Sequence, residues 1–166
     1  MKKVFIIDND SDTHENIAAL CSDINVEFLP KVGDDFDKFR SLISRRYSKG
    51  NRDAVAQAAK NDIERVLAHS KGSENDTVFV VTYNLTATDA FTWKEPDANG
   101  IKFYEEFLYG KPTIMTYESF CRPEVDIAKY FHADYPDCKI LPYDNKEFIP
   151  LLGLVLKRFF ATKTLD

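Results

Sequence analysis

Short apolar runs rich in β-branched residues alternate with stretches of helical periodicity along the chain, and this alternation restricts the fold more than any other feature. Runs of this length and composition, bounded by turn residues, are typical of buried strands. They lie at Lys3–Asp8, Val26–Leu29, Thr77–Thr82, Thr113–Thr116 and Cys138–Leu141. The alternation predicts an α/β domain built on a doubly wound, five-stranded parallel sheet.

Between these runs, apolar residues recur at the spacing of one helix face. The expected helices cover Asp12–Ser22, a segment from Asp34 to about Tyr47, Arg52–His69, Gly100–Leu108, Pro123–Phe131 and Asn145–Ala161. The two helices within residues 34–76 form an insert between the second and third strands, and residues 86–99 form a long polar loop. A length of 166 residues suits a single domain over 1–166.

Acidic residues stand where the first strand ends. Asp8-Asn9-Asp10 follows its apolar run directly, and Asp12 is expected to cap the helix that comes next. Ligands of open α/β sheets bind beyond the carboxyl ends of the strands. Carboxylates at that place can hold Mg²⁺ or carry a phosphoryl group, so the feature indicates an origin in phosphoryl chemistry.

Five segments, in order and on the expected elements, resemble the receiver domain of bacterial response regulators. The match covers most of the chain outside residues 34–76 and 86–99. Its segments are Ile7-Asp8-Asn9-Asp10-Ser11-Asp12, Val80-Val81-Thr82-Tyr83-Asn84-Leu85, Gly100-Ile101-Lys102-Phe103-Tyr104, Pro112-Thr113-Ile114-Met115-Thr116-Tyr117 and Ile140-Leu141-Pro142-Tyr143-Asp144. The resemblance implies a flavodoxin-like strand order, 2-1-3-4-5, and a role in two-component signal transduction.

In the family that this chain resembles, an Asp after the third strand accepts the phosphoryl group and two acids after the first strand help to hold Mg²⁺. A Lys after the fifth strand pairs with the phosphate, and a Ser or Thr after the fourth senses it. The corresponding positions here form a vestigial phosphorylation site, Asp8, Asn9, Thr82, Thr116 and Leu141. Thr82 stands in place of the acceptor Asp, Asn9 in place of the second acid, and Leu141 in place of the Lys. Lys139 does not restore the cation, because it lies two residues early on the face of Leu141.

The expectation is therefore a degenerate pseudo-receiver, without enzymatic activity or a cofactor, that acts through protein–protein interaction. Its partner is expected to be a signalling protein supplied in trans. By resemblance to the family, Tyr117 and Tyr143 are candidate partner-binding residues, with half-buried packing as the alternative. Trp93 is a third candidate, either as an interface anchor or as a side chain buried under its own loop.

A phosphatase is the alternative function. Asp8-x-Asp10 after an apolar strand also resembles the start of a haloacid-dehalogenase-type enzyme, in which Asp8 would be the nucleophile and Asp10 the general acid or base. These two carboxylates would then share a Mg²⁺ ion. Against this, Ser11-Asp12 stands where that family has Gly-Thr, and no convincing late acidic pair follows. A small ligand at the strand ends is a third option, although no Gly-rich phosphate loop is present.

Charge and composition limit the classes of partner that we expect. The formal net charge of −5 argues against a nucleic-acid partner, and no apolar stretch approaches the roughly 18 residues of a membrane span. A basic cluster around the inserted helices is interpreted as a solvated helix face, with an acidic partner or nucleic acid as alternatives. It comprises Arg40, Arg45, Arg46, Lys49 and Arg52. The sequence is compatible with a homodimer.

The three cysteines lack any CxxC spacing, and no secretory signal is evident after Lys2-Lys3. Reduced thiols and a cytoplasmic location are therefore expected. The three histidines, His14, His69 and His132, are not at metal-ligand spacing.

Overall fold

The computed structural model of the chain describes residues 1–8, 11–48, 50, 52–70, 76–82, 85, 99–117, 137–142 and 148–165. Five parallel strands form one sheet in the order β2-β1-β3-β4-β5, which confirms the predicted α/β fold and its strand order. The strands are β1 (Lys2–Ile7), β2 (Val26–Leu29), β3 (Thr77–Thr82), β4 (Thr113–Tyr117) and β5 (Cys138–Pro142).

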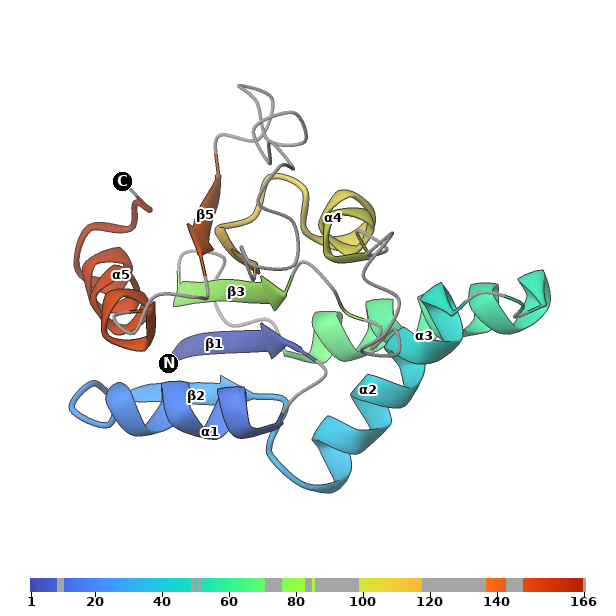
Figure 1. The fold of residues 1–166 in the computed structure, drawn as a ribbon, viewed down its shortest axis with the longest axis horizontal. Helices are drawn as coiled ribbons and strands as arrows, with labels where there is room; N and C mark the ends of the chain where they lie inside the picture. Colours follow the sequence, from blue (N-terminus) through green and yellow to red (C-terminus); the bar gives the residue numbers. More distant parts are fainter. Residues whose placement is uncertain are drawn as a thin grey trace.

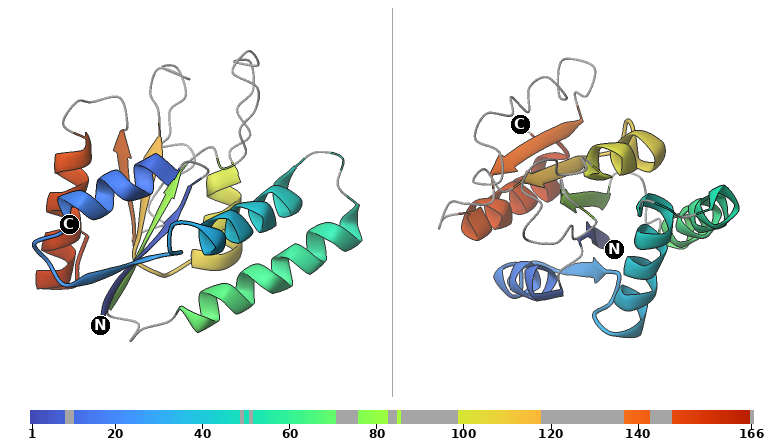
Figure 2. Two further views of the ribbon diagram at one scale, coloured as in Figure 1. Left: turned by 90° about the horizontal axis from the view of Figure 1, so that it is seen from below. Right: turned by 45° about the vertical axis from the view of Figure 1, so that its right-hand side comes forward.

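Helices cover both faces of the sheet, as parallel strands buried on two sides require. They are α1 (Ser11–Leu20), α2 (Asp34–Tyr47), α3 (Asp53–His69), α4 (Asn99–Phe103) with its continuation η2 (Tyr104–Leu108), and α5 (Phe148–Thr162). Helices α1 and α5 lie on one face, whereas α2, α3 and α4 lie on the other (Figures 1 and 2). Among the described residues, no helix has the length and apolar character that crossing a membrane would need.

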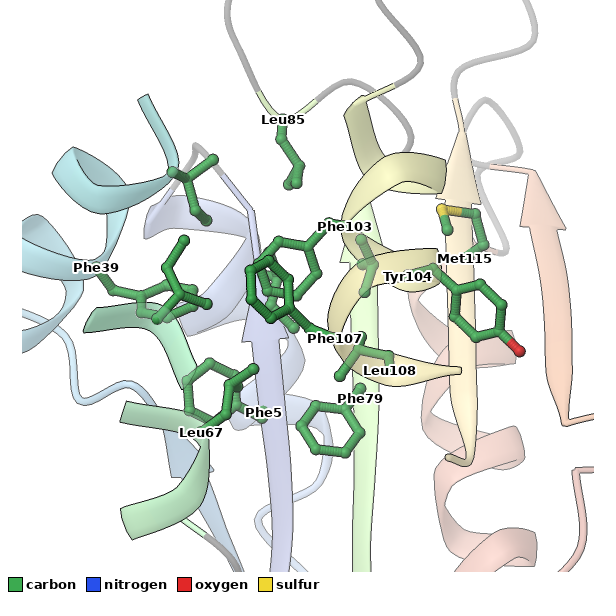
Figure 3. Close-up of a cluster of buried hydrophobic side chains, with 14 of the residues drawn as sticks. Phe5, Phe39, Leu67, Phe79, Leu85, Phe103, Tyr104, Phe107, Leu108 and Met115 are labelled. Carbon is green, nitrogen blue, oxygen red and sulfur yellow. The ribbon is translucent and has the colours of Figure 1, made fainter. Parts of the chain in front are cut away.

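The core consists of two clusters separated by the sheet, because successive strand residues point to opposite faces. In β1, Val4 and Ile6 join the cluster under α1 and α5, and Phe5 and Ile7 join the cluster under α2, α3 and α4. The second of these clusters is rich in aromatic rings (Figure 3). Phe103 and Phe107 lie 4.8 Å apart between ring centroids, at a separation where aromatic pairs attract beyond simple area burial.

The predicted insert between β2 and β3 is confirmed as the helical hairpin α2–α3. Its apolar side faces the sheet through buried side chains on both helices, which are Phe36, Phe39, Ile43, Ala59, Ile63 and Leu67. Full burial of a large apolar side chain contributes about 2 kcal/mol, so this base holds the hairpin to the sheet more firmly than any surface ion pair would.

Several local predictions were wrong. Helix α1 begins at Ser11, so Asp12 lies inside the first turn rather than capping it, where its carboxylate suits the positive end of the helix dipole. Apolar Val55 and Leu151 lie in helices expected to bury one apolar face, yet they are 41% and 39% exposed. The segment after Phe103 widens into a π-helix. Asn99, expected to end the loop at 86–99, is the first residue of α4; the rest of that loop and the expected helix Pro123–Phe131 lie outside the described residues.

Candidate functional site

The carboxyl ends of β1, β3, β4 and β5 bring four of the predicted site residues into one row. Strand pairing places Thr82 beside Thr116, and Thr116 beside Leu141. Asp8 extends the row, because it follows Ile7 as Thr82 follows Val81, and Ile7 and Val81 are paired. Residues drawn from positions 8 to 141 of the chain are thus neighbours at one edge of the sheet. We call Asp8, Thr82, Thr116 and Leu141 the strand-end row.

The two threonine hydroxyls in the middle of the row are joined to each other. Thr82 Oγ1 lies 3.2 Å from Thr116 Oγ1, and Thr116 Oγ1 lies 3.5 Å from the carbonyl oxygen of Val81. One consistent arrangement has Thr82 donating to Thr116 while Thr116 donates to that carbonyl, since each hydroxyl has a single proton. Thr116 is buried and Thr82 half-buried. The position that resembles a phosphoryl acceptor therefore carries a neutral hydroxyl engaged in an internal hydrogen bond.

The end of the row at β5 is apolar. Leu141 is only 4% exposed and packs in the core cluster under α1 and α5. Lys139 pairs with Ile114, two residues before the pair formed by Thr116 and Leu141. The strand register thus confirms that Lys139 lies on the face of Leu141 but not at the end of the strand. Within the described residues, no lysine occupies the row.

Asp8 is the one carboxylate in the row, and it is 8% exposed. Among the described residues, no group of three or more His, Cys, Asp or Glu side chains is placed to hold a metal ion. A single buried carboxylate beside two hydroxyls offers Mg²⁺ few of the hard anionic ligands that it prefers. The described part of the row is therefore better suited to internal hydrogen bonding and packing than to phosphoryl transfer.

The remaining predicted residues are placed only in part. Asn9, Asp10, Trp93 and Tyr143 lie outside the described residues. Tyr117 ends β4, where its backbone pairs with Pro142. The phosphatase alternative rests on Asp8 and Asp10 together, and of these two the structure describes Asp8 alone.

The burial of His14 was not predicted from the sequence. This titratable residue follows Asp8 of the strand-end row by six positions. Its ring lies between Phe28 of β2 and Phe36 of α2, with centroids 6.3 Å and 6.1 Å away. Within the described part of the chain, neither ring nitrogen makes a hydrogen bond of ordinary geometry. The spacing of His14, Ile17 and Cys21, at i, i+3 and i+7, was the available signal that the histidine shares the buried side of α1.

Sequence reasoning also missed the ion pair between Arg46 and Glu106, which ties the hairpin to η2. Glu106 Oε2 accepts hydrogen bonds from Arg46 Nε at 3.1 Å and Nη2 at 3.0 Å. Arg46 Nη1 also donates to the carbonyl of Ala56 in α3, at 3.4 Å. Burial, and then the negative charge of Glu106, raise the pKa of the adjoining Tyr47, so its phenol stays protonated.

No protein-family model matches this chain, and neither the curated proteins nor the solved structures contain a significant match to it.

Proposed function

We propose that this chain is a receiver-like signalling module that is not phosphorylated on Asp and acts by binding another protein. The strand-end row is the observation that carries the proposal. At the acceptor position, Thr82 is held by the hydroxyl of Thr116, and buried Leu141 takes the place of the phosphate-pairing Lys. The free thiols of Cys21 and Cys138 are in keeping with the cytoplasmic setting that this role would require.

The chemistry of the row supports a loss of phosphoryl transfer. An acceptor must be nucleophilic, and an alcohol needs a base to take its proton before it attacks. The transferring phosphoryl group also accumulates negative charge, which cations normally neutralise. The described row offers Thr82 a hydroxyl neighbour in place of a cation, and Leu141 adds no charge.

The test is incubation with Mg²⁺ and acetyl phosphate, followed by intact-mass analysis of the protein and measurement of released phosphate. We expect an unchanged mass and release at the background rate. A stable adduct of one phosphate would refute the proposal. Release above background that disappears in Asp8→Ala would replace it with the phosphatase alternative, in which Asp8 is the nucleophile.

A further inference from the structure

Basic residues are concentrated in one short segment of an otherwise acidic chain. Residues 38–52 contain six basic and no acidic side chains, which are Lys38, Arg40, Arg45, Arg46, Lys49 and Arg52. Removing these six positive charges from the formal net charge of −5 leaves the rest of the chain at −11. The segment covers the second half of α2 and the turn into α3. A charge separation of this size produces a local positive potential.

The same part of the hairpin extends away from the sheet. The first turns of α3 lie further from the sheet than the rest of the helix in both views (Figures 1 and 2). We define the hairpin tip as residues 44–58. None of its described residues is buried, whereas Ile43 and Ala59, which flank it, are 2% exposed each.

The hairpin tip adds little to the stability of the domain. The contacts between its described residues and the body include the Arg46–Glu106 pair and the packing of half-buried Tyr47 near Phe103, with 6.4 Å between ring centroids. Ordering a residue costs about 1–2 kcal/mol of backbone entropy, and the tip returns little apolar burial to offset that cost. Apolar Val55 remains 41% exposed. A role outside the isolated domain would account for such a segment.

We propose that the hairpin tip binds an acidic segment of a partner protein. This inference rests on the proposed function and adds to it a surface and the chemistry of the partner. Arg45 and Arg52 are exposed, and a guanidinium group matches a carboxylate with two parallel hydrogen bonds. Val55, three residues after Arg52 in the same tip, is an exposed apolar side chain that can add apolar contact. Arg46 pairs with Glu106 of η2.

The position of nearby carboxylates favours a short acidic peptide over a nucleic acid. Asp34, Asp35 and Asp37 occupy the first turn of α2, and Arg45 lies about 12 to 16 Å further along the helix axis. That distance is about one and a half to two Debye lengths at physiological salt. A duplex crossing the tip would extend over these carboxylates and be repelled, whereas a short peptide can bind the tip without crossing them.

The experiment is a titration of isotope-labelled protein with a ten-residue peptide of Glu with one Tyr, followed through backbone amide signals. We expect the signals that shift to belong to residues 40–58 and not to Asp34, Asp35 or Asp37, which a ten-residue peptide is long enough to reach but should avoid, and we expect added salt to weaken the binding. Arg45→Glu/Arg52→Glu should raise the Kd about tenfold, since it removes two charge-assisted contacts. Lys102→Glu/Arg158→Glu, which makes the same change in net charge at exposed sites elsewhere, should change the Kd less than about twofold.

Four results would overturn this proposal. The first two concern the amide signals, which would either not shift at all or shift over the whole surface. The third is an equal loss of peptide affinity in both double variants. The fourth is tighter tip-dependent binding of a single-stranded or duplex oligonucleotide whose charge equals that of the peptide. Sedimentation of the protein without peptide is a further test. If the protein self-associates and Arg45→Glu/Arg52→Glu abolishes this, the hairpin tip binds a second copy of the chain instead of an acidic partner. Each of these outcomes is independent of the acetyl phosphate test, so the two proposals fail separately.

Discussion

The imidazole of His14 is buried where charge is poorly tolerated. Its ring is 3% exposed and packs edge-on against Phe28 and Phe36, so α1, β2 and α2 meet around it. Burial lowers the pKa of His14 below its usual 6.5, although the backbone of Pro30 and Leu29 and the charge of Glu15 act in the opposite direction. The neutral ring is therefore the form that the fold accepts.

This pKa shift predicts a loss of stability in mild acid. The unfolded chain binds a proton at His14 more readily than the folded chain does, so the free energy of unfolding is highest above pH 6.5. It should fall as the pH drops from 6.5 towards the lowered pKa, by at most about 1.4 kcal/mol per pH unit for one proton. Urea unfolding of wild type and His14→Leu from pH 7 to pH 5 measures the effect.

The variant should show a flatter dependence than wild type over this range. His69→Asn serves as the control, because it removes an exposed histidine at the end of α3. Asp23, whose pKa is lowered by its hydrogen bond with Lys157, titrates below pH 3.8 and does not interfere. Parallel pH profiles for wild type and His14→Leu would show that His14 is not the responsive group.

At the scale of elements, the α2–α3 hairpin is held in two ways. Its apolar base packs on the sheet, where Phe39 meets Phe5 with ring centroids 5.2 Å apart. Nearer the tip, Arg46 joins α2 to η2 through Glu106 and to α3 through the carbonyl of Ala56. Both side chains of the ion pair are only partly exposed, at 21% and 25%. The base provides the stability, and the ion pair fixes the direction of the hairpin.

A double-mutant cycle on Arg46 and Glu106 tests the second part of this division. We expect a coupling energy of about 1 kcal/mol from Arg46→Ala, Glu106→Ala and the double variant in urea unfolding, because the pair is partly shielded and doubly hydrogen-bonded. The matched control is Arg65–Asp62, which is formed at 2.8 Å but is 73% and 45% exposed. Its coupling should stay below about 0.5 kcal/mol. Equal coupling in the two cycles would contradict a fixing role for Arg46.

At the scale of the whole molecule, the strand-end row joins residues that only the complete sheet brings together. The row therefore predicts that three substitutions can create an Asp that accepts a phosphoryl group, as in the receiver domains that this chain resembles. In Asn9→Asp/Thr82→Asp/Leu141→Lys, acetyl phosphate with Mg²⁺ should add one phosphate to the protein. The new Asp at position 82 stands in the row next to Asp8, and their repulsion should be relieved by the cation. Mg²⁺ should accordingly raise the Tm of this variant and not that of wild type.

Two controls accompany the restored variant. Leu141→Lys alone should gain no phosphate, because it supplies a cation without an acceptor. The triple variant with Asp8→Ala in addition should lose its response to Mg²⁺. If the triple variant keeps its circular dichroism spectrum but gains no phosphate, the row does not preserve the geometry of a receiver site.

Much of the architecture could be predicted from the sequence because the strands carry strong local signals. The bounds predicted for Thr77–Thr82 and Val26–Leu29 coincide with β3 and β2, since turn residues or polar ends limit each apolar run. The π-helix η2 was not predictable, because α- and π-helical turns have nearly the same spacing of apolar residues in a short segment. Its geometry accompanies the burial of Tyr104, Phe107 and Leu108, which tertiary packing decides.

The candidate site was predictable only where position along a strand determines it. Thr82, Thr116 and Leu141 are the residues that the resemblance selected, and the strand register makes them neighbours. In α5, apolar residues occur on more than one side, since Leu151 and Leu154 are 39% and 64% exposed, so helical spacing alone does not identify its buried face. The spacing of His14 along α1 indicates that it shares the buried side of the helix, whereas its contacts with Phe28 and Phe36 come from other elements and are contained in no local pattern.

The place of β1 inside the sheet has a consequence for the order of folding. Its partner β3 begins at Thr77, which pairs with Lys3, so the chain must close a long loop before these strands can join. Loop closure is entropically costly, and pairing between distant segments slows folding. Helices α2 and α3 lie within that loop and contact each other locally. Early formation of this hairpin would shorten the effective loop, so the same insert that extends from the finished domain would also speed the search for its central strand pair.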